Sequence, residues 1–287
     1  MKTIILMPTK NEEWILPITI SAASSIAEKI IVSDQKSQDK TIEILKKSNN
    51  IDFIENKNIG HSNQVRWELL DYARSNYGKN NLIITIDADE IIPHSIFKNY
   101  RNNILSNKPG TIFSLPWIQL WKSVEKYRSD KGVWSPKTNK KACMFIDDGI
   151  LSYDNKFVIN DHTSRVPNQN IRDKIDIQVP LLHFQFANWE RSQIKQIWYQ
   201  CTELLNGLDP ETINNKYFHS KNQEGVKLRK VKKSWLKNIS ITNSITTSSI
   251  PETWYFSEIK EMFNKYGIKK FEKLDIWDNK YIQSLIN

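Results

Sequence analysis

The sequence has few cysteines and lacks long apolar runs. Among its 287 residues are only two cysteines, Cys143 and Cys201, which lie far apart and form no CxxC pair. Neither a disulfide framework nor a zinc site is therefore predicted. No stretch approaches the roughly 20 apolar residues that a membrane-spanning helix needs, and the apolar start of the chain ends at Pro8, too early for a secretory signal. We expect a cytoplasmic protein.

The sequence also lacks the two common phosphate-binding loops. It has only eight glycines, no GxGxxG segment follows a predicted strand, and no GxxxxGK[ST] segment occurs. The usual dinucleotide-binding and P-loop cradles are therefore excluded. A phosphate-bearing ligand has to be bound by other groups.

Positive charge is in excess, and it lies in the C-terminal part. The chain carries 41 Lys and Arg against 32 Asp and Glu. The first 100 residues hold 12 basic and 13 acidic residues, and the remainder holds 29 and 19. Residues 227–237 contain no acid, and such a run can bind anionic lipid, a phosphorylated glycan or nucleic acid. A solvated helix face is the plainer alternative.

Short apolar segments alternate with longer helical segments in the N-terminal part. This alternation predicts an α/β fold with a doubly wound, mostly parallel sheet. Strands are predicted at 3–7, 29–33, 51–54 and 81–86, with helices at 13–26, 39–47 and 63–77. Further along, strands are predicted at 110–121, 141–146 and 179–186, and helices at 189–206 and 251–266.

Polar residues follow three of the N-terminal strands. They are the segment from Pro8 to Glu13, the segment from Asp34 to Asp39, and the cluster from Asp87 to Glu90. Because ligands bind at the carboxyl ends of the strands in such sheets, these segments are predicted to form one site.

Asp87 and Asp89 are separated by one residue where the chain leaves the fourth strand. Both carboxylates can turn toward one cation there, and hard oxygen ligands suit Mg²⁺ or Mn²⁺. Such an ion typically takes its remaining ligands from waters and substrate phosphates. The alternative is that these acids favour the start of a helix near Pro93 through its dipole.

Four motifs, in order over about 100 residues, carry a family resemblance. They are Pro8-Thr9-Lys10-Asn11-Glu12-Glu13, the stretch from Asp34 to Thr41, the Asn58-Ile59-Gly60 turn with its helix, and Asp87-Ala88-Asp89-Glu90. Each is short, but together they resemble the family 2 glycosyltransferases of the GT-A fold. That resemblance implies a Rossmann-like GT-A domain with nucleotide-sugar-binding residues 1–108 and acceptor-binding residues 109–220. Residues 221–287 are then predicted to form a basic helical C-terminal extension.

The resemblance implies which residues contact the donor nucleotide and its diphosphate. Other roles stay open for some of them: Pro8 can simply end its strand, Glu12 can be a helix-start charge, and Arg66 can lie on a helix surface. The predicted donor-site residues are Pro8, Thr9, Asn11, Glu12, Asp34, Asn63, Arg66, Asp87 and Ala88.

GT-A enzymes often add a later histidine to the metal shell. The resemblance therefore makes His183 the predicted third ligand beside Asp87 and Asp89, with His162 as the weaker choice. A core histidine with satisfied hydrogen bonds is the alternative for His183.

The catalytic base is not marked by a clear motif. Many relatives carry an E-D pair whose acid serves as base, and no convincing equivalent is found here. We predict Asp161 first and Asp147 second as the base, although either can be a turn aspartate.

The predicted activity is an inverting, metal-dependent transfer of a sugar from a nucleotide diphosphate sugar, with UDP favoured. The acceptor is expected to be a glycan or lipid-linked glycan in bacterial surface polysaccharide synthesis. Residues 227–237 then suggest peripheral contact with an anionic membrane at its inner face. The rivals are a nucleotidyltransferase, which needs a Gly-rich basic loop that is absent, and a nucleic-acid-binding protein, which leaves the acidic cluster unexplained.

Overall fold

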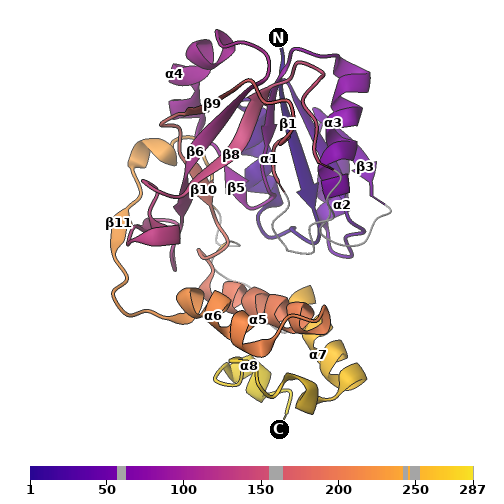
Figure 1. The fold of residues 1–287 in the computed structure, drawn as a ribbon, viewed down its shortest axis with the longest axis vertical. Coiled ribbons are helices and arrows are strands. Elements are labelled where there is room, and N and C mark those ends of the chain that lie inside the picture. Colours follow the sequence, from indigo (N-terminus) through magenta and orange to yellow (C-terminus); the bar gives the residue numbers. More distant parts are fainter. Residues whose placement is uncertain (57–62, 155–163, 242–244, 246–252, 287) are drawn as a thin grey trace.

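The computed structural model describes residues 1–56, 63–154, 164–241, 245 and 253–286. Most of the chain forms an α/β layer structure, and its last helices gather beyond one end of the sheet (Figure 1). Among the described helices, none combines the length and the apolar character needed to cross a membrane.

The central sheet is mixed and mostly parallel, which confirms the predicted fold class. Its strands run in the order β3-β2-β1-β4-β8-β6-β10-β5, and β9 pairs with β6. β8 runs antiparallel to both β4 and β6, and β5 runs antiparallel to β10. The strands are β1 (Thr3–Thr9), β2 (Lys29–Asp34), β3 (Ile51–Glu55), β4 (Leu82–Thr85), β5 (Glu90–Ile91), β6 (Thr111–Gln119), β8 (Lys140–Ile146), β9 (Asp173–Asp176) and β10 (Leu181–His183).

Helices bury both faces of this sheet. On β1, Ile5 and Met7 belong to a core cluster with residues of α1 and α4, whereas Ile4 and Leu6 belong to a cluster with residues of α3. This alternation follows from the two-residue period of a strand, and burial of both faces is typical of parallel sheets. The helices concerned are α1 (Leu16–Ser24), α2 (Thr41–Lys46), α3 (Asn63–Tyr77) and α4 (His94–Leu105).

The helices α5 (Trp189–Leu205), α6 (Pro210–Lys221), α7 (Trp254–Tyr266) and α8 (Lys280–Gln283) share a second core. It runs from Ile194 to Ile282 in the sequence and includes Ile259 and Phe271, both fully buried. The sequence had suggested a boundary between residues 220 and 221. Residues of α5 and α6 contribute to the same apolar core as residues of α7, and the domain bounds remain a prediction.

The basic run 227–237 is not a helix. Its first part forms β11 (Leu228–Lys230), which pairs antiparallel with β7 (Lys126–Arg128) as a separate two-stranded sheet. A 3₁₀ turn follows, and it buries Trp235 against Tyr127. Within the predicted helical extension 221–287, which contains α7 and α8, this run is an exception, because backbone pairing with a distant strand determines its local conformation.

The second core predicts how a variant of α7 behaves. Ile259→Ala removes a fully buried side chain and should lower the free energy of unfolding by about 3 kcal/mol. Urea denaturation followed by circular dichroism measures this loss. Lys260→Ala, an exposed neighbour on α7, is the matched control, and equal effects of the two substitutions would contradict the packing described.

Candidate active site

The acidic segment Asp87 to Glu90 makes a tight turn between β4 and β5. The Glu90 amide donates to the Asp87 carbonyl at 3.0 Å, and the Asp87 amide donates to the Glu90 carboxylate at 3.0 Å. The Ala88 carbonyl accepts from the Thr19 hydroxyl of α1 at 2.6 Å. The turn is thereby held at the carboxyl end of β4, where the sequence placed it.

Strand register brings His183 to Asp89. His183 is paired with Gln119 in parallel β6 and with Glu90 in antiparallel β5. Its Nε2 lies 3.4 Å from Asp89 Oδ1, and its ring stacks on Trp117 with centroids 4.7 Å apart. Burial would raise the pKa of Asp89, but His183 and Lys195 hold it well below its usual range. Asp89 is therefore a carboxylate.

Gln119 orients the histidine ring. His183 Nδ1 lies 2.7 Å from Gln119 Oε1, an oxygen that can only accept. This bond keeps a proton on Nδ1, so Nε2 faces Asp89 and can donate its own proton to that carboxylate or, without that proton, offer a lone pair to a cation. A nitrogen lone pair and a carboxylate oxygen aimed at one point fit a shared cation, and the amide is the kind of outer partner that fixes a metal-binding imidazole.

Two arginines hold the other acids of the turn. Arg66 and Arg165 each lie 2.6 Å from a different oxygen of Asp87, and Arg165 also contacts the fully buried Glu90. Although burial opposes ionisation, the two guanidinium groups lower the pKa of Asp87 to about 2. Glu90 also accepts from the Trp117 indole at 2.8 Å. Arg66 is buried here and does not lie on a helix surface.

Helix α5 supplies two further cations that the sequence did not reveal. Lys195 Nζ lies 3.7 Å from Asp89 and 4.0 Å from Glu12, and Arg191 lies 3.5 Å from Glu12. Both cations are buried, and Tyr255 of α7 lies beside them. Burial raises the pKa of Glu12, while Arg191 and Lys195 oppose that rise. Arg191 and Lys195 are four residues apart, so the sequence could have indicated that they share one helix face. Only the fold shows that this face meets the site.

The loops after β1 and β2 are joined by hydrogen bonds. Asp34 accepts from the Ser37 amide at 2.9 Å, and burial raises its pKa. The Asn11 amide donates to Ser37 Oγ at 2.7 Å, and Asn11 has a left-handed φ of 52°. The Thr9 hydroxyl is buried and has no hydrogen-bond partner among the described residues, so it is available to bind a ligand. Pro8 lies beside Thr9 at the end of β1.

Three predicted residues can be placed only in part or not at all. Asn63 begins α3, and nothing further is described of it. Asp161 and His162 lie outside the described residues.

Asp147 lies at the wrong edge of the sheet for the predicted catalytic role. Its backbone bonds to Asn80 and Asn81, which precede β4, so it is at the amino end of that strand. Its buried carboxylate pairs with Arg74 at 2.6 Å. A base has to reach the reacting groups. The structure therefore does not support Asp147 as the base, and it explains this acid as part of a structural ion pair.

The predicted three-residue metal set is not assembled. Within the described ranges, no group of three or more His, Cys, Asp or Glu side chains is placed to hold a metal together. Asp87 is at the same edge, but its oxygens bind Arg66 and Arg165. The residues that do fit a hard divalent cation are Asp89 and His183, with other ligands left for phosphate and water.

Comparison with known proteins gives a family, together with solved structures of low similarity. The family model described as Glycosyl transferase family 2 matches residues 4–165, more than half of the chain. No curated protein matches. A solved 4-diphosphocytidyl-2C-methyl-D-erythritol synthase is similar over 62% of this chain and 88% of its own, with 15% identity and a TM-score of 0.42.

A second solved structure is glucosyl-3-phosphoglycerate synthase from Mycobacterium tuberculosis with Mn²⁺, uridine diphosphate and glucosyl-3-phosphoglycerate. It is 20% identical over 40% of this chain, with a TM-score of 0.32. The chain spans 43% of that synthase. Similarities this low support no inference about function.

The position of Asp147 predicts a structural defect on its removal. Asp147→Ala leaves the half-buried Arg74 without its carboxylate and should lower the free energy of unfolding by about 3 kcal/mol. Urea unfolding measures the change. Asp71→Ala removes an exposed acid from the same helix as Arg74 and should have little effect, so equal stability of the two variants would refute the structural role.

Proposed function

Because the chain belongs to glycosyl transferase family 2, as its motifs predicted, we propose that it transfers a sugar from a nucleotide diphosphate sugar to a glycan or lipid-linked glycan, with inversion at the sugar carbon. UDP is the favoured nucleotide, and bacterial surface polysaccharide synthesis is the proposed setting. The observation that carries this proposal is the meeting of Asp89 and His183 at the carboxyl edge of the sheet, beside the loops after β1 and β2. Family membership argues against both rivals, the nucleotidyltransferase and the nucleic-acid-binding protein.

The nucleotide is proposed to bind between the first two strand ends. Pro8, Thr9, Asn11 and Asp34 line that position, and the unpartnered Thr9 hydroxyl favours a ligand there. Asp34 offers a carboxylate that can accept hydrogen bonds from a base or ribose. Because Asn11 and Ser37 tie the two loops together, the nucleotide meets a preformed surface.

Mg²⁺ or Mn²⁺ is the proposed cofactor, held by Asp89 and His183. Such an ion supplies positive charge to the departing diphosphate. Gln119 keeps the His183 lone pair turned toward the ion, and Asp87 holds Arg66 and Arg165 at the same edge. Asn63 and Ala88 complete the proposed donor site, with Asn63 at the start of α3 and Ala88 inside the turn.

Lys195 and Arg191 are proposed to bind the diphosphate from the helical side. Both lie buried beside the carboxylates of Asp89 and Glu12. A fixed cation in a buried site stabilises the developing charge of a leaving group, since it needs no reorganisation during the reaction. Glu12 then keeps the two cations in place before the donor arrives.

Asp161 remains the proposed base. It precedes Arg165 by four residues, and Arg165 contacts Asp87 and Glu90. Four residues of chain span at most about 14 Å. The choice of Asp161 therefore rests on its position in the sequence, since the residue lies outside the described part of the chain.

A peripheral contact with anionic membrane is proposed for the basic run 227–237. Lys230, Lys232 and Lys233 are exposed there, and the exposed Leu228 adds an apolar contact. Each such lysine near an anionic surface contributes about 1 kcal/mol. An acceptor bound to lipid at the inner face of the membrane would then be presented to the site.

The metal assignment predicts a loss of donor chemistry in one variant. Wild-type protein should hydrolyse or bind one of the UDP-, GDP- or CMP-sugars only when Mg²⁺ or Mn²⁺ is present. Asp89→Asn keeps the size of the side chain but loses the ligand charge, so activity should fall roughly 100-fold. Coupled release of nucleotide measures it, and thermal melting checks the fold. Asp173→Asn, on the exposed β9, is the control, and an unchanged response in Asp89→Asn sinks the assignment.

The role of Lys195 predicts a charge-specific defect. Lys195→Met should lower the turnover number for the same donor roughly 100-fold with melting retained, because the leaving diphosphate loses a fixed cation. Lys195→Arg should restore part of the rate. Lys260→Met, on the exposed face of α7, should behave as wild type. If arginine at position 195 fails to restore the turnover number but other apolar residues restore it, Lys195 acts only in packing.

A further inference from the structure

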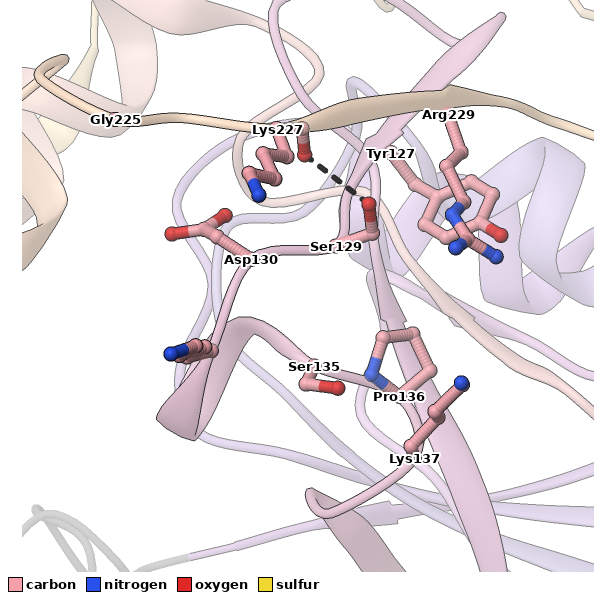
Figure 2. A pocket seen from close by; sticks show the side chains of 10 residues that line it. Tyr127, Ser129, Asp130, Ser135, Pro136, Lys137, Gly225, Lys227 and Arg229 are labelled. Atoms are coloured by element: carbon pink, nitrogen blue, oxygen red, sulfur yellow. Dashed lines mark hydrogen bonds between the residues drawn. The ribbon is translucent and has the colours of Figure 1, made fainter.

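A pocket of about 580 Å³ lies between β7, the 3₁₀ turn Gly132–Trp134 and β11. Figure 2 shows Lys227, just before β11, and Arg229 of β11 above it, Lys137 below, and the hydroxyls of Ser129 and Ser135 between them. Its volume is that of a small-molecule site. None of its lining residues belongs to the proposed donor site.

The charges around this pocket are unbalanced. Lys131, Lys137, Lys227 and Arg229 line it, and none has an ion-pair partner in the described part of the chain. The one acid in its wall, Asp130, is bound by the Arg128 guanidinium through three contacts of 2.8 to 3.0 Å. Four basic groups therefore meet at one hollow with no carboxylate left to neutralise them.

Strand register explains why only some residues of the basic run line the pocket. Side chains alternate along a strand, so Lys227 and Arg229 share a face while Leu228 points away. Pairing of Arg229 with Tyr127 fixes that face, and the Lys227 carbonyl accepts from the Ser129 amide at 2.8 Å. The pocket is preformed, which lowers the cost of binding.

The pocket is joined to the candidate site through backbone pairing. Tyr127, in its wall, forms a β-bridge with Leu120, and the Leu120 amide donates to the His183 carbonyl at 3.0 Å. Two strand spacings separate His183 from Tyr127, which is about 10 Å. A molecule the size of a phosphorylated sugar or disaccharide can span that distance.

We propose that this pocket binds a phosphate group carried by the acceptor. Lysine and arginine are the residues that bind phosphate through charge-assisted hydrogen bonds, and a phosphomonoester carries up to about two negative charges at neutral pH. Phosphate binding stands on the pocket alone, whereas its assignment to the acceptor rests on the proposed function. The phosphate can belong to a soluble sugar phosphate or to a lipid, and the two sources share this chemistry.

The test compares two double variants of equal charge. Lys227→Ala/Arg229→Ala removes two pocket cations, and Lys230→Ala/Lys233→Ala removes two exposed lysines of the same run that do not line it. Titration calorimetry with inorganic phosphate should show about tenfold weaker binding at the pocket for the first pair only. Thermal melting checks folding, and metal-dependent donor hydrolysis should persist in both pairs.

A second titration distinguishes the sources, using phosphatidylcholine vesicles with and without phosphatidic acid. If the pocket pair loses more vesicle binding than the control pair, the phosphate is carried by lipid. If it loses no more than the control pair while its inorganic phosphate binding is weakened, the phosphate is soluble. Equal phosphate affinity of the two pairs, or no phosphate binding by wild type, overturns the proposal. Loss of donor hydrolysis in wild type would instead refute the proposed function, so the two failures are separable.

Discussion

Buried negative charge at the carboxyl edge of the sheet is the constraint on which the site depends. A carboxylate is costly to bury unless opposite charge or hydrogen bonds accompany it. Each acid at this edge is met by a cation or donor from a distant segment. The acids are Glu12, Asp87, Asp89 and Glu90, and their partners are Arg66, Arg165, His183, Arg191, Lys195 and Trp117. Helix α5 therefore has to lie at this edge, with Arg191 and Lys195 directed at the acids.

The pairing of acids with cations at this edge also suits the binding of a donor diphosphate together with a divalent cation. A divalent ion on Asp89 and His183 would leave Lys195 and Arg191 available for phosphate oxygens. The basic pocket beside β7 extends this positive surface toward the acceptor side, with its own acid already paired to Arg128. Donor and acceptor would then be held by separate sets of cations, one on α5 and one around the β7–β11 sheet.

The sequence predicted the sheet and one half of the site. Strand ends and the Asp87-Ala88-Asp89-Glu90 motif are local features, so the loops after β1, β2 and β4 were found. Arg165 and Lys195 were missed because only tertiary packing brings them to these acids. Asp147 has a motif-like position after a strand, but β8 runs antiparallel to β4, so its end lies at the opposite edge. The basic run 227–237 was included in a predicted helical extension. Its strand pairing with β7 could not be foreseen, because β7 is distant in the sequence.

The central claim is that Asp89 and His183 together hold the ion at the donor diphosphate. Anomalous diffraction from crystals grown with Mn²⁺ and uridine diphosphate tests it most directly. The account predicts one peak within coordination distance of both an Asp89 carboxylate oxygen and His183 Nε2. A peak held by other acids, or a nucleotide bound with no metal between these two side chains, would contradict it.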